Sequence, residues 1–211
     1  MIYSSKGGYE SMSAKKVSST IKKNPFNYQK SKMIANLIIA GFDKKEIYSK
    51  VFTDNKIDIS SLPRRREVTN EIYRRLINLD ATLLKAFVSH DIITSKFILI
   101  YAIAKVDKLF YEFLSLTYRD ALLGNKKYIS RDDFDHFFLA KKESDLIVAS
   151  WSPVTIELLA KGYRKLLVDS GLGARKVKNI HVNKIFIHPD ISKYIEAIGD
   201  YNYLQAILGE R

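Results

Sequence analysis

The residues best suited to chemistry lie in one segment, SSLPRRREVTNEIYRRL at residues 60–76, which holds five arginines, three of them consecutive. Arginine carries a planar guanidinium group that matches phosphate oxygens and the acceptor edge of guanine. The two glutamates of the segment, Glu67 and Glu71, neutralise only part of this charge. Lysine would be the commoner choice if solubility were the only requirement. The segment therefore indicates contact with an anionic polymer.

Helical periodicity over residues 62–79 separates a buried face from an exposed one. At about 100° per residue, the apolar residues share one face: Val68, Ile72, Leu76 and Leu79. Three polar side chains lie one turn apart on the opposite side: Arg66, Asn70 and Arg74. Arginine can pair bidentately with guanine and asparagine with adenine, so this line is suited to a major groove.

The remaining arginines of this helix are Arg64, Arg65 and Arg75. We expect Arg64 and Arg75 at the edges of the buried face, within reach of a backbone phosphate, with Arg65 close by. The alternative is a solvated helix face on which Glu67 and Glu71 pair with nearby arginines, each pair contributing a few tenths of a kcal/mol.

A second basic helix is predicted at residues 152–170. It turns Lys161, Arg164 and Lys165 outward, and a β-hairpin predicted near residues 176–188, with its turn near Asn183–Lys184, adds further cations: Arg175, Lys176 and Lys178. In a winged-helix arrangement this helix and its wing would meet DNA. Leu158 and Val168 also point outward, so contact with DNA and contact with another protein stay open for this helix.

One acidic cluster raises the question of catalysis: Asp132, Asp133, Asp135 and His136. A nuclease could use such a set, but Ser130 and Asp133 have the spacing of a helix capping box, which explains the aspartates more simply. The chain has no P-loop, GxGxxG or GxSxG motif. We predict no enzyme, no cofactor, no metal and no small-molecule substrate.

These segments sit in a predicted mainly α-helical chain of four parts. Residues 1–27 form a flexible or loosely docked arm, 28–79 a helix-turn-helix-like unit, 80–125 the central apolar helices, and 126–211 a winged-helix-like unit with closing helices. Only one stretch alternates at the period of a strand, so we expect at most one small β-hairpin.

The composition restricts the compartments and partners that we expect for the chain. The net charge is +12, and residues 1–79 hold 16 Lys and Arg against 7 Asp and Glu, an excess of +9. No apolar stretch is long enough to span a bilayer. The absence of cysteine suits a reducing interior and excludes disulfides and thiolate metal sites. We expect a cytoplasmic protein that does not insert into a membrane.

Two long stretches resemble the BrxA family of bacterial BREX (bacteriophage exclusion) defence systems. One is DFDHFFLAKKESDLIVASWSPVTIELLAKGYRKLLVDSGLG, with Trp151-Ser152 and Ser170-Gly171-Leu172. The other is KSKMIANLIIAGFDKKEIYSKVFTDNKIDISSLPRRREVTNEIYRRLINL, with Asn55 and Arg75-Leu76. The resemblance covers about residues 28–210. It implies an almost entirely helical protein that binds double-stranded DNA without known catalysis and acts beside other BREX proteins.

Three functions therefore compete. The first is a non-enzymatic double-stranded DNA-binding component of phage defence. The second is an RNA-binding helical module, although no aromatic stacking platform on a sheet is predicted. The third is a protein-interaction scaffold within the same defence complex, on which the basic face is incidental.

Overall fold

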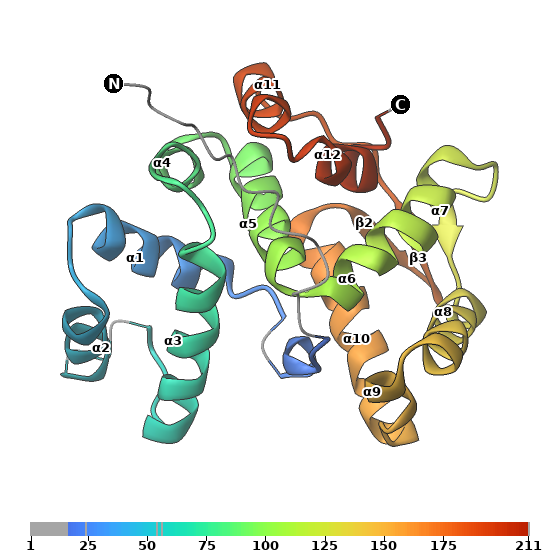
Figure 1. Cartoon of the computed structure of the whole chain (residues 1–211), viewed down its shortest axis with the longest axis horizontal. Coiled ribbons are helices and arrows are strands. Elements are labelled where there is room, and N and C mark those ends of the chain that lie inside the picture. Colours follow the sequence, from blue (N-terminus) through green and yellow to red (C-terminus); the bar gives the residue numbers. More distant parts are fainter. Residues whose placement is uncertain (1–16, 24, 54, 56, 211) are drawn as a thin grey trace, which may run out of the picture.

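Helices make up most of the computed structural model in Figure 1, which describes residues 17–210 except residues 24, 54 and 56. The predicted mainly helical class is confirmed. A small antiparallel sheet completes the fold, with strand order β1-β3-β2: β1 (Tyr128–Ile129), β2 (Gly173–Lys176) and β3 (Asn179–Val182). No helix within the described residues is both long and apolar enough to cross a bilayer.

The first three helices are α1 (Tyr28–Ile39), α2 (Lys44–Thr53) and α3 (Leu62–Leu76). Their ends follow from local chemistry. Gly41 takes the left-handed conformation after α1, with φ of 84°. Asp43 and Glu46 form a capping box before α2, because each accepts a hydrogen bond from the other's backbone N–H, at 2.8 and 2.7 Å. Pro63 lies in the first turn of α3, where its missing N–H costs least.

The central helices form the hydrophobic middle of the molecule. They are α4 (Ala81–Ser89), α5 (Ile92–Val106), α6 (Lys108–Phe113), the π-helical turn η3 (Leu114–Tyr118) and α7 (Arg119–Leu123). Asp80, Asp91 and Asp107 cap α4, α5 and α6 by accepting backbone N–H groups. Residues 97–104 of α5 are buried on every side, as expected of a helix that is apolar all round. The helices α3, α4, α6, α10 and α12 pack against α5 (Figure 1).

The last third of the chain carries α8 (Arg131–Ser144), α9 (Leu146–Ala149), α10 (Pro153–Ser170), α11 (Pro189–Ala197) and α12 (Tyr201–Leu208). The predicted capping box of Ser130 and Asp133 opens α8. Ser152 caps α10 with Pro153 in its first turn, and Gly171 ends it with φ of 87°. The predicted boundaries of α10 are therefore confirmed.

The turn of the β-hairpin differs from the prediction. Lys176 pairs with Asn179, so the turn lies at Val177–Lys178 and not near Asn183–Lys184. Two-residue hairpin turns need a positive φ at their first central residue, and Val177 supplies it with φ of 54°. No glycine or asparagine marks this position, and apolar residues go on alternating beyond β3, so the sequence pattern misplaced the turn. The short strand β1 adds a third strand, pairing Tyr128 with His181.

The described part of the N-terminal arm, from residue 17, packs into the fold. Its 3-10 turn η2 (Thr20–Lys22) contacts α10. Ile21 is 1% exposed and lies against Gly162, where an added Cβ would stand 3.0 Å from the Ile21 carbonyl oxygen. Because the segment also contacts α3 through side chains, it bridges the N-terminal helices and α10. Residues 1–16 of the predicted arm lie outside the described residues.

Candidate nucleic-acid interface

Arg75 does not occupy the edge of the buried face of α3, contrary to the prediction. Its side chain is fully buried. The Nε atom donates to Glu71 Oε1 at 3.0 Å, and Nη1 donates to the carbonyl of Pro25 at 2.8 Å. Burial lowers the pKa of Arg75, and the charge of Glu71 counteracts that shift. A guanidinium held in this way is out of reach of a phosphate outside the protein.

Arg65 is also committed to the interior, with 6% of its surface exposed. It donates to the carbonyl of Phe52, in the last turn of α2, at 2.7 Å and to the carbonyl of Ile59 at 2.8 Å. Carbonyl groups at the end of a helix lack partners within the helix. Arg65 therefore fixes the connection between α2 and α3.

Two half-buried arginines of α3 hold the N-terminal arm. Arg64 donates to the carbonyl of Lys23 at 2.6 Å and forms an ion pair with Glu67 at 2.7 Å. Arg74 forms an ion pair with Glu71 at 2.8 Å and donates to the carbonyl of Val106 at 3.2 Å. Arg74 thus departs from the predicted exposed line. The ion pairs of Glu71 with Arg74 and Arg75 are of the kind that the alternative, a helix face of paired charges, describes.

Arg66 and Asn70 remain exposed on α3. They border a hollow of about 540 Å³ together with Phe52 and Leu62, and the guanidinium carbon of Arg66 lies 5.9 Å from the centre of the Phe52 ring. Asn70 accepts a hydrogen bond from the hydroxyl of Tyr48. Burial and the nearby Tyr73 raise the pKa of Tyr48, so this hydroxyl stays protonated at neutral pH. The contact role of Arg66 and Asn70 stays a prediction.

The basic residues of α10 differ in their exposure and in their contacts with other side chains. Lys161 is exposed, and no ion pair is found for it within the described residues. Lys165 is exposed but forms an ion pair with Asp169 at 2.9 Å. Arg164 is half-buried, with its guanidinium carbon 4.4 Å from the ring centre of Phe134 in α8. The sequence correctly predicted that Leu158 and Val168 point outward, since they are 42% and 39% exposed.

Positive charge gathers where α8, α10 and β2 meet. Burial lowers the pKa of Arg164, and the nearby charges of Arg131 and Arg175 lower this pKa further. The charge of Asp135 acts in the opposite direction. Sequence reasoning missed Arg131, which opens α8 and pairs with Asp135 at 3.6 Å. The one feature in the sequence that could have drawn attention to Arg131 is its position in the first turn of a helix, where the helix dipole favours acidic residues. The exposed residues Arg175, Lys176 and Lys178 extend this charge along the hairpin.

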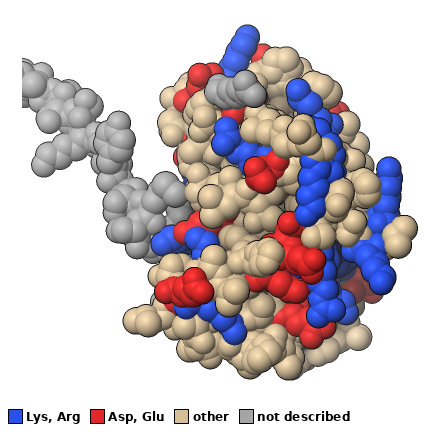
Figure 2. Space-filling view, turned by 90° about the vertical axis from the view of Figure 1, so that its right-hand side faces the viewer, with Lys and Arg blue, Asp and Glu red and all other residues tan. Residues whose placement is uncertain are grey.

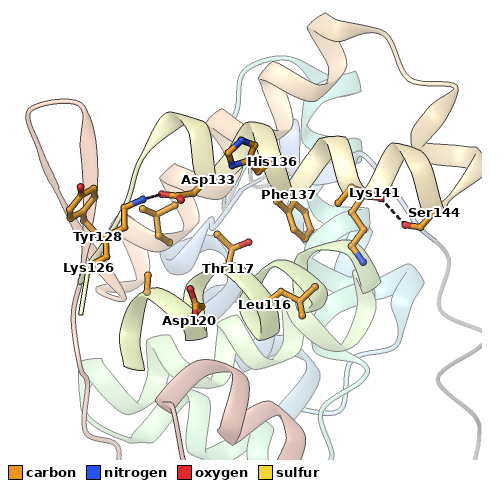
Figure 3. Close-up of a pocket in the computed structure, with 13 residues that line it drawn as sticks. Leu116, Thr117, Asp120, Lys126, Tyr128, Asp133, His136, Phe137, Lys141 and Ser144 are labelled. Carbon is orange, nitrogen blue, oxygen red and sulfur yellow. Dashed lines mark hydrogen bonds and ion pairs between the residues drawn. The ribbon is translucent and has the colours of Figure 1, made fainter. Parts of the chain in front are cut away.

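A separate cavity of about 430 Å³ lies between η3, α7, β1 and α8 (Figure 3). It is lined by Asp133 and His136 of the acidic cluster found in the sequence, and Asp133 has structural partners. Lys126 points to Asp133 (Figure 3), which also accepts hydrogen bonds from Ser130, and these bonds lower the pKa of Asp133 although burial alone would raise it. Lys141 forms an ion pair with Glu112 at 3.0 Å. Within the described residues, no group of His, Asp and Glu is placed to hold a metal ion.

Charge is mixed on the face that carries α7 and α8. Figure 2 shows lysine and arginine side chains interspersed there with aspartate and glutamate. A polyanion could not lie across the whole of this face without meeting carboxylates. An anionic partner on this face would therefore be met by local groups of cations.

Comparison with known proteins identifies the family. A sequence model named BrxA matches residues 15–199. The chain belongs to the BrxA family. The resemblance found in the sequence is thereby confirmed, and the matched range includes the arm from residue 17, all of α3 and the whole hairpin.

A relative of the BrxA family supports this assignment. The chain is 29% identical over 192 residues to a protein named "BREX protein BrxA" from Bacillus cereus (strain H3081.97), covering 91% of this chain and 96% of the relative. A crystal structure of an uncharacterized protein from Magnetospirillum magneticum shares the fold, with a TM-score of 0.80 and 17% identity over 92% of this chain and 99% of that one. At that identity, the likeness shows the fold alone.

Proposed function

We propose that this BrxA-family protein is a non-enzymatic component of a bacterial BREX phage-defence system that binds double-stranded DNA in the cytoplasm. One observation carries the proposal. Exposed cations on three elements have no ion-pair partner within the described residues: Arg66 on α3, Lys161 on α10, and Arg175, Lys176 and Lys178 on the hairpin. Such cations keep their charge available for a polyanion.

The helix and the hairpin suit different parts of a duplex. Arg66 and Asn70 lie one turn apart on the exposed face of α3, which is the arrangement that can reach base edges in a major groove. A hairpin with cations on β2 and at its tip is better suited to backbone phosphates. Arg65 and Arg75 have no place in this interface because they are buried.

The test is a comparison of polymers. Fluorescence anisotropy should measure binding of equal-length double-stranded DNA, single-stranded DNA and RNA at two salt concentrations. We expect duplex DNA to bind most tightly, and log K to fall against log salt by about 0.9 for each phosphate neutralised. Tighter binding of RNA would replace the proposal with the RNA-binding module. Failure to bind any of the three at low salt would replace it with the protein scaffold.

A further inference from the structure

One end of the C-terminal part of the molecule exposes apolar side chains that the fold does not cover. Leu146 of α9 is 91% exposed, Ile147 is 45% exposed, and Val154 and Leu158 of α10 are 64% and 42% exposed. Val154 and Leu158 are four residues apart and so share one face of α10. Only three residues separate α9 from α10, so the two helices lie next to each other (Figure 1). We call these four residues the apolar end.

The exposure of Leu146 belongs to an ordered helix. Asp145 caps α9 by accepting the backbone N–H groups of Ile147 at 2.8 Å and Val148 at 3.2 Å. Val148 is fully buried and anchors the helix to the core. The fold thus holds Leu146 in water. Single exposed leucines are ordinary, but adjacent apolar residues on ordered helices mark interaction surfaces.

The charge around the apolar end points to the chemistry of its partner. Residues 143–160 contain Glu143, Asp145 and Glu157 but no lysine or arginine, in a chain with a net charge of +12. These carboxylates disfavour phosphates, so a protein that carries cations suits the apolar end better than DNA does. Protein interfaces combine an apolar centre with a polar rim. The complementary surface has apolar residues bordered by lysine or arginine.

We propose that the apolar end docks another protein of the same BREX system, through a segment whose apolar side chains are flanked by cations. This assigns the first half of α10, with Val154 and Leu158, to a protein partner. The second half, with Lys161, stays available to DNA. The inference rests on the BREX role in the proposed function and is independent of DNA binding.

The experiment uses the other proteins of the BREX system, each purified separately, and biolayer interferometry against the immobilised full-length chain. We expect one of them to bind. The double substitution Leu146→Asp and Val154→Asp should weaken that binding at least tenfold or so, because truncating central apolar contacts of an interface has effects of about that size. Val168→Asp is the control: it introduces the same charge at an exposed apolar residue of α10, 39% exposed and outside the apolar end, and should change binding less than about twofold. Both altered residues are exposed, and thermal melts should confirm that every variant folds.

Charge reversal gives an independent readout. Glu143→Lys combined with Glu157→Lys should weaken partner binding severalfold at low salt and less at high salt, because salt screens exposed charges. Duplex DNA binding measured on the same samples should be unchanged or tighter. A failure of DNA binding in the unaltered chain would count against the proposed function and leave this inference standing.

Three results would overturn the inference. The first is that no BREX protein binds the unaltered chain. The second is that one binds and the apolar-end variants bind it equally well. The third is that light scattering shows self-association of the unaltered chain, which the double substitution abolishes. In the last case the occupant is a second copy of the chain.

Discussion

Two arginines of α3 have opposite environments. Arg75 is buried between Glu71 and the Pro25 carbonyl, whereas Arg66 is exposed beside Phe52. Replacing Arg75 by alanine leaves the Pro25 carbonyl without this donor and the buried Glu71 with one cation fewer, and should lower the free energy of unfolding by about 3–5 kcal/mol. Arg66→Ala should change it by less than about 0.5 kcal/mol. Guanidinium chloride unfolding of both variants measures these effects.

The same pair separates stability from DNA binding. Arg66→Ala should weaken duplex binding: by about 1–3 kcal/mol on preferred sequences if the side chain reads a base, or on all sequences, with a lower salt slope, if it contacts a phosphate. A variant that melts and binds DNA like the unaltered chain would make Arg66 an ordinary solvated residue.

Asp107 is a buried carboxyl group at the junction of α5, α6 and the arm. Burial raises the pKa of Asp107 to about 6, against the opposing effects of the Phe110 N–H and the charges of Arg74 and Arg75. The folded chain therefore holds this proton more tightly than the unfolded chain, whose carboxyl has a pKa near 3.8. Between these two pKa values the contribution of Asp107 to the free energy of unfolding falls as pH rises, by roughly 3 kcal/mol in total.

The substitution Asp107→Asn tests this pH dependence, because asparagine does not ionise and can still cap α6. The stability of the variant relative to the unaltered chain should increase from about pH 4 to pH 6 and then level off. Denaturant unfolding at a series of pH values gives the difference. A relative stability of the variant that stays constant, or that falls over this range, would contradict the assigned pKa.

Helix periodicity predicted part of the α3 site. The buried residues Val68, Ile72 and Leu76 were correctly predicted from their spacing. Arg75 was not, because a long side chain can turn inward when a distant segment supplies a carbonyl. Its partner Pro25 lies in the arm, and no local pattern reveals that contact. The sequence pattern therefore predicted more exposed arginines on α3 than the structure has.

At the scale of elements, the hairpin offers the most direct test of phosphate contact. Changing Arg175, Lys176 and Lys178 to alanine one at a time should each reduce the salt slope of DNA binding by about one if a phosphate contact is lost. Lys108→Ala is a suitable control, since that lysine lies near Glu112, at 3.8 Å. If all four variants have the same salt slope of DNA binding as the unaltered chain, the hairpin is not part of the interface.

Helix boundaries were easier to predict than the hairpin turn. Capping boxes at Asp43 and Ser130 and the glycine at 171 act within a few residues, so their pattern is complete in the sequence. The turn at Val177 depends on a valine in a conformation that this residue type rarely adopts. Strand pairing imposes that conformation, and pairing is not local. The third strand β1 was missed because its two residues are too few to show an alternating pattern, so that only its pairing with β3 defines it.

At the scale of the whole molecule, the arm and α5 join the N-terminal and C-terminal parts into one body. We expect a single cooperative unfolding transition by both circular dichroism and tryptophan fluorescence, because Trp151 and α3 share the connected core. Ile21→Ala should lower the free energy of unfolding by about 2–4 kcal/mol, through the cavity left against α10. Two separate transitions in the unaltered chain would show that the parts fold independently.

The contact of Ile21 with Gly162 also sets an order of events during synthesis. Ile21 is made well before its partner helix α10, because 140 residues separate Ile21 from Gly162. At about 5–20 residues per second, the interval is roughly 7–28 s. During that time the arm can join α3 through Arg64 and Arg75 but has no place to bury Ile21. The nascent protein therefore stays open at its own centre until α10 has been made, and a ribosome stalled before α10 would release a chain prone to proteolysis.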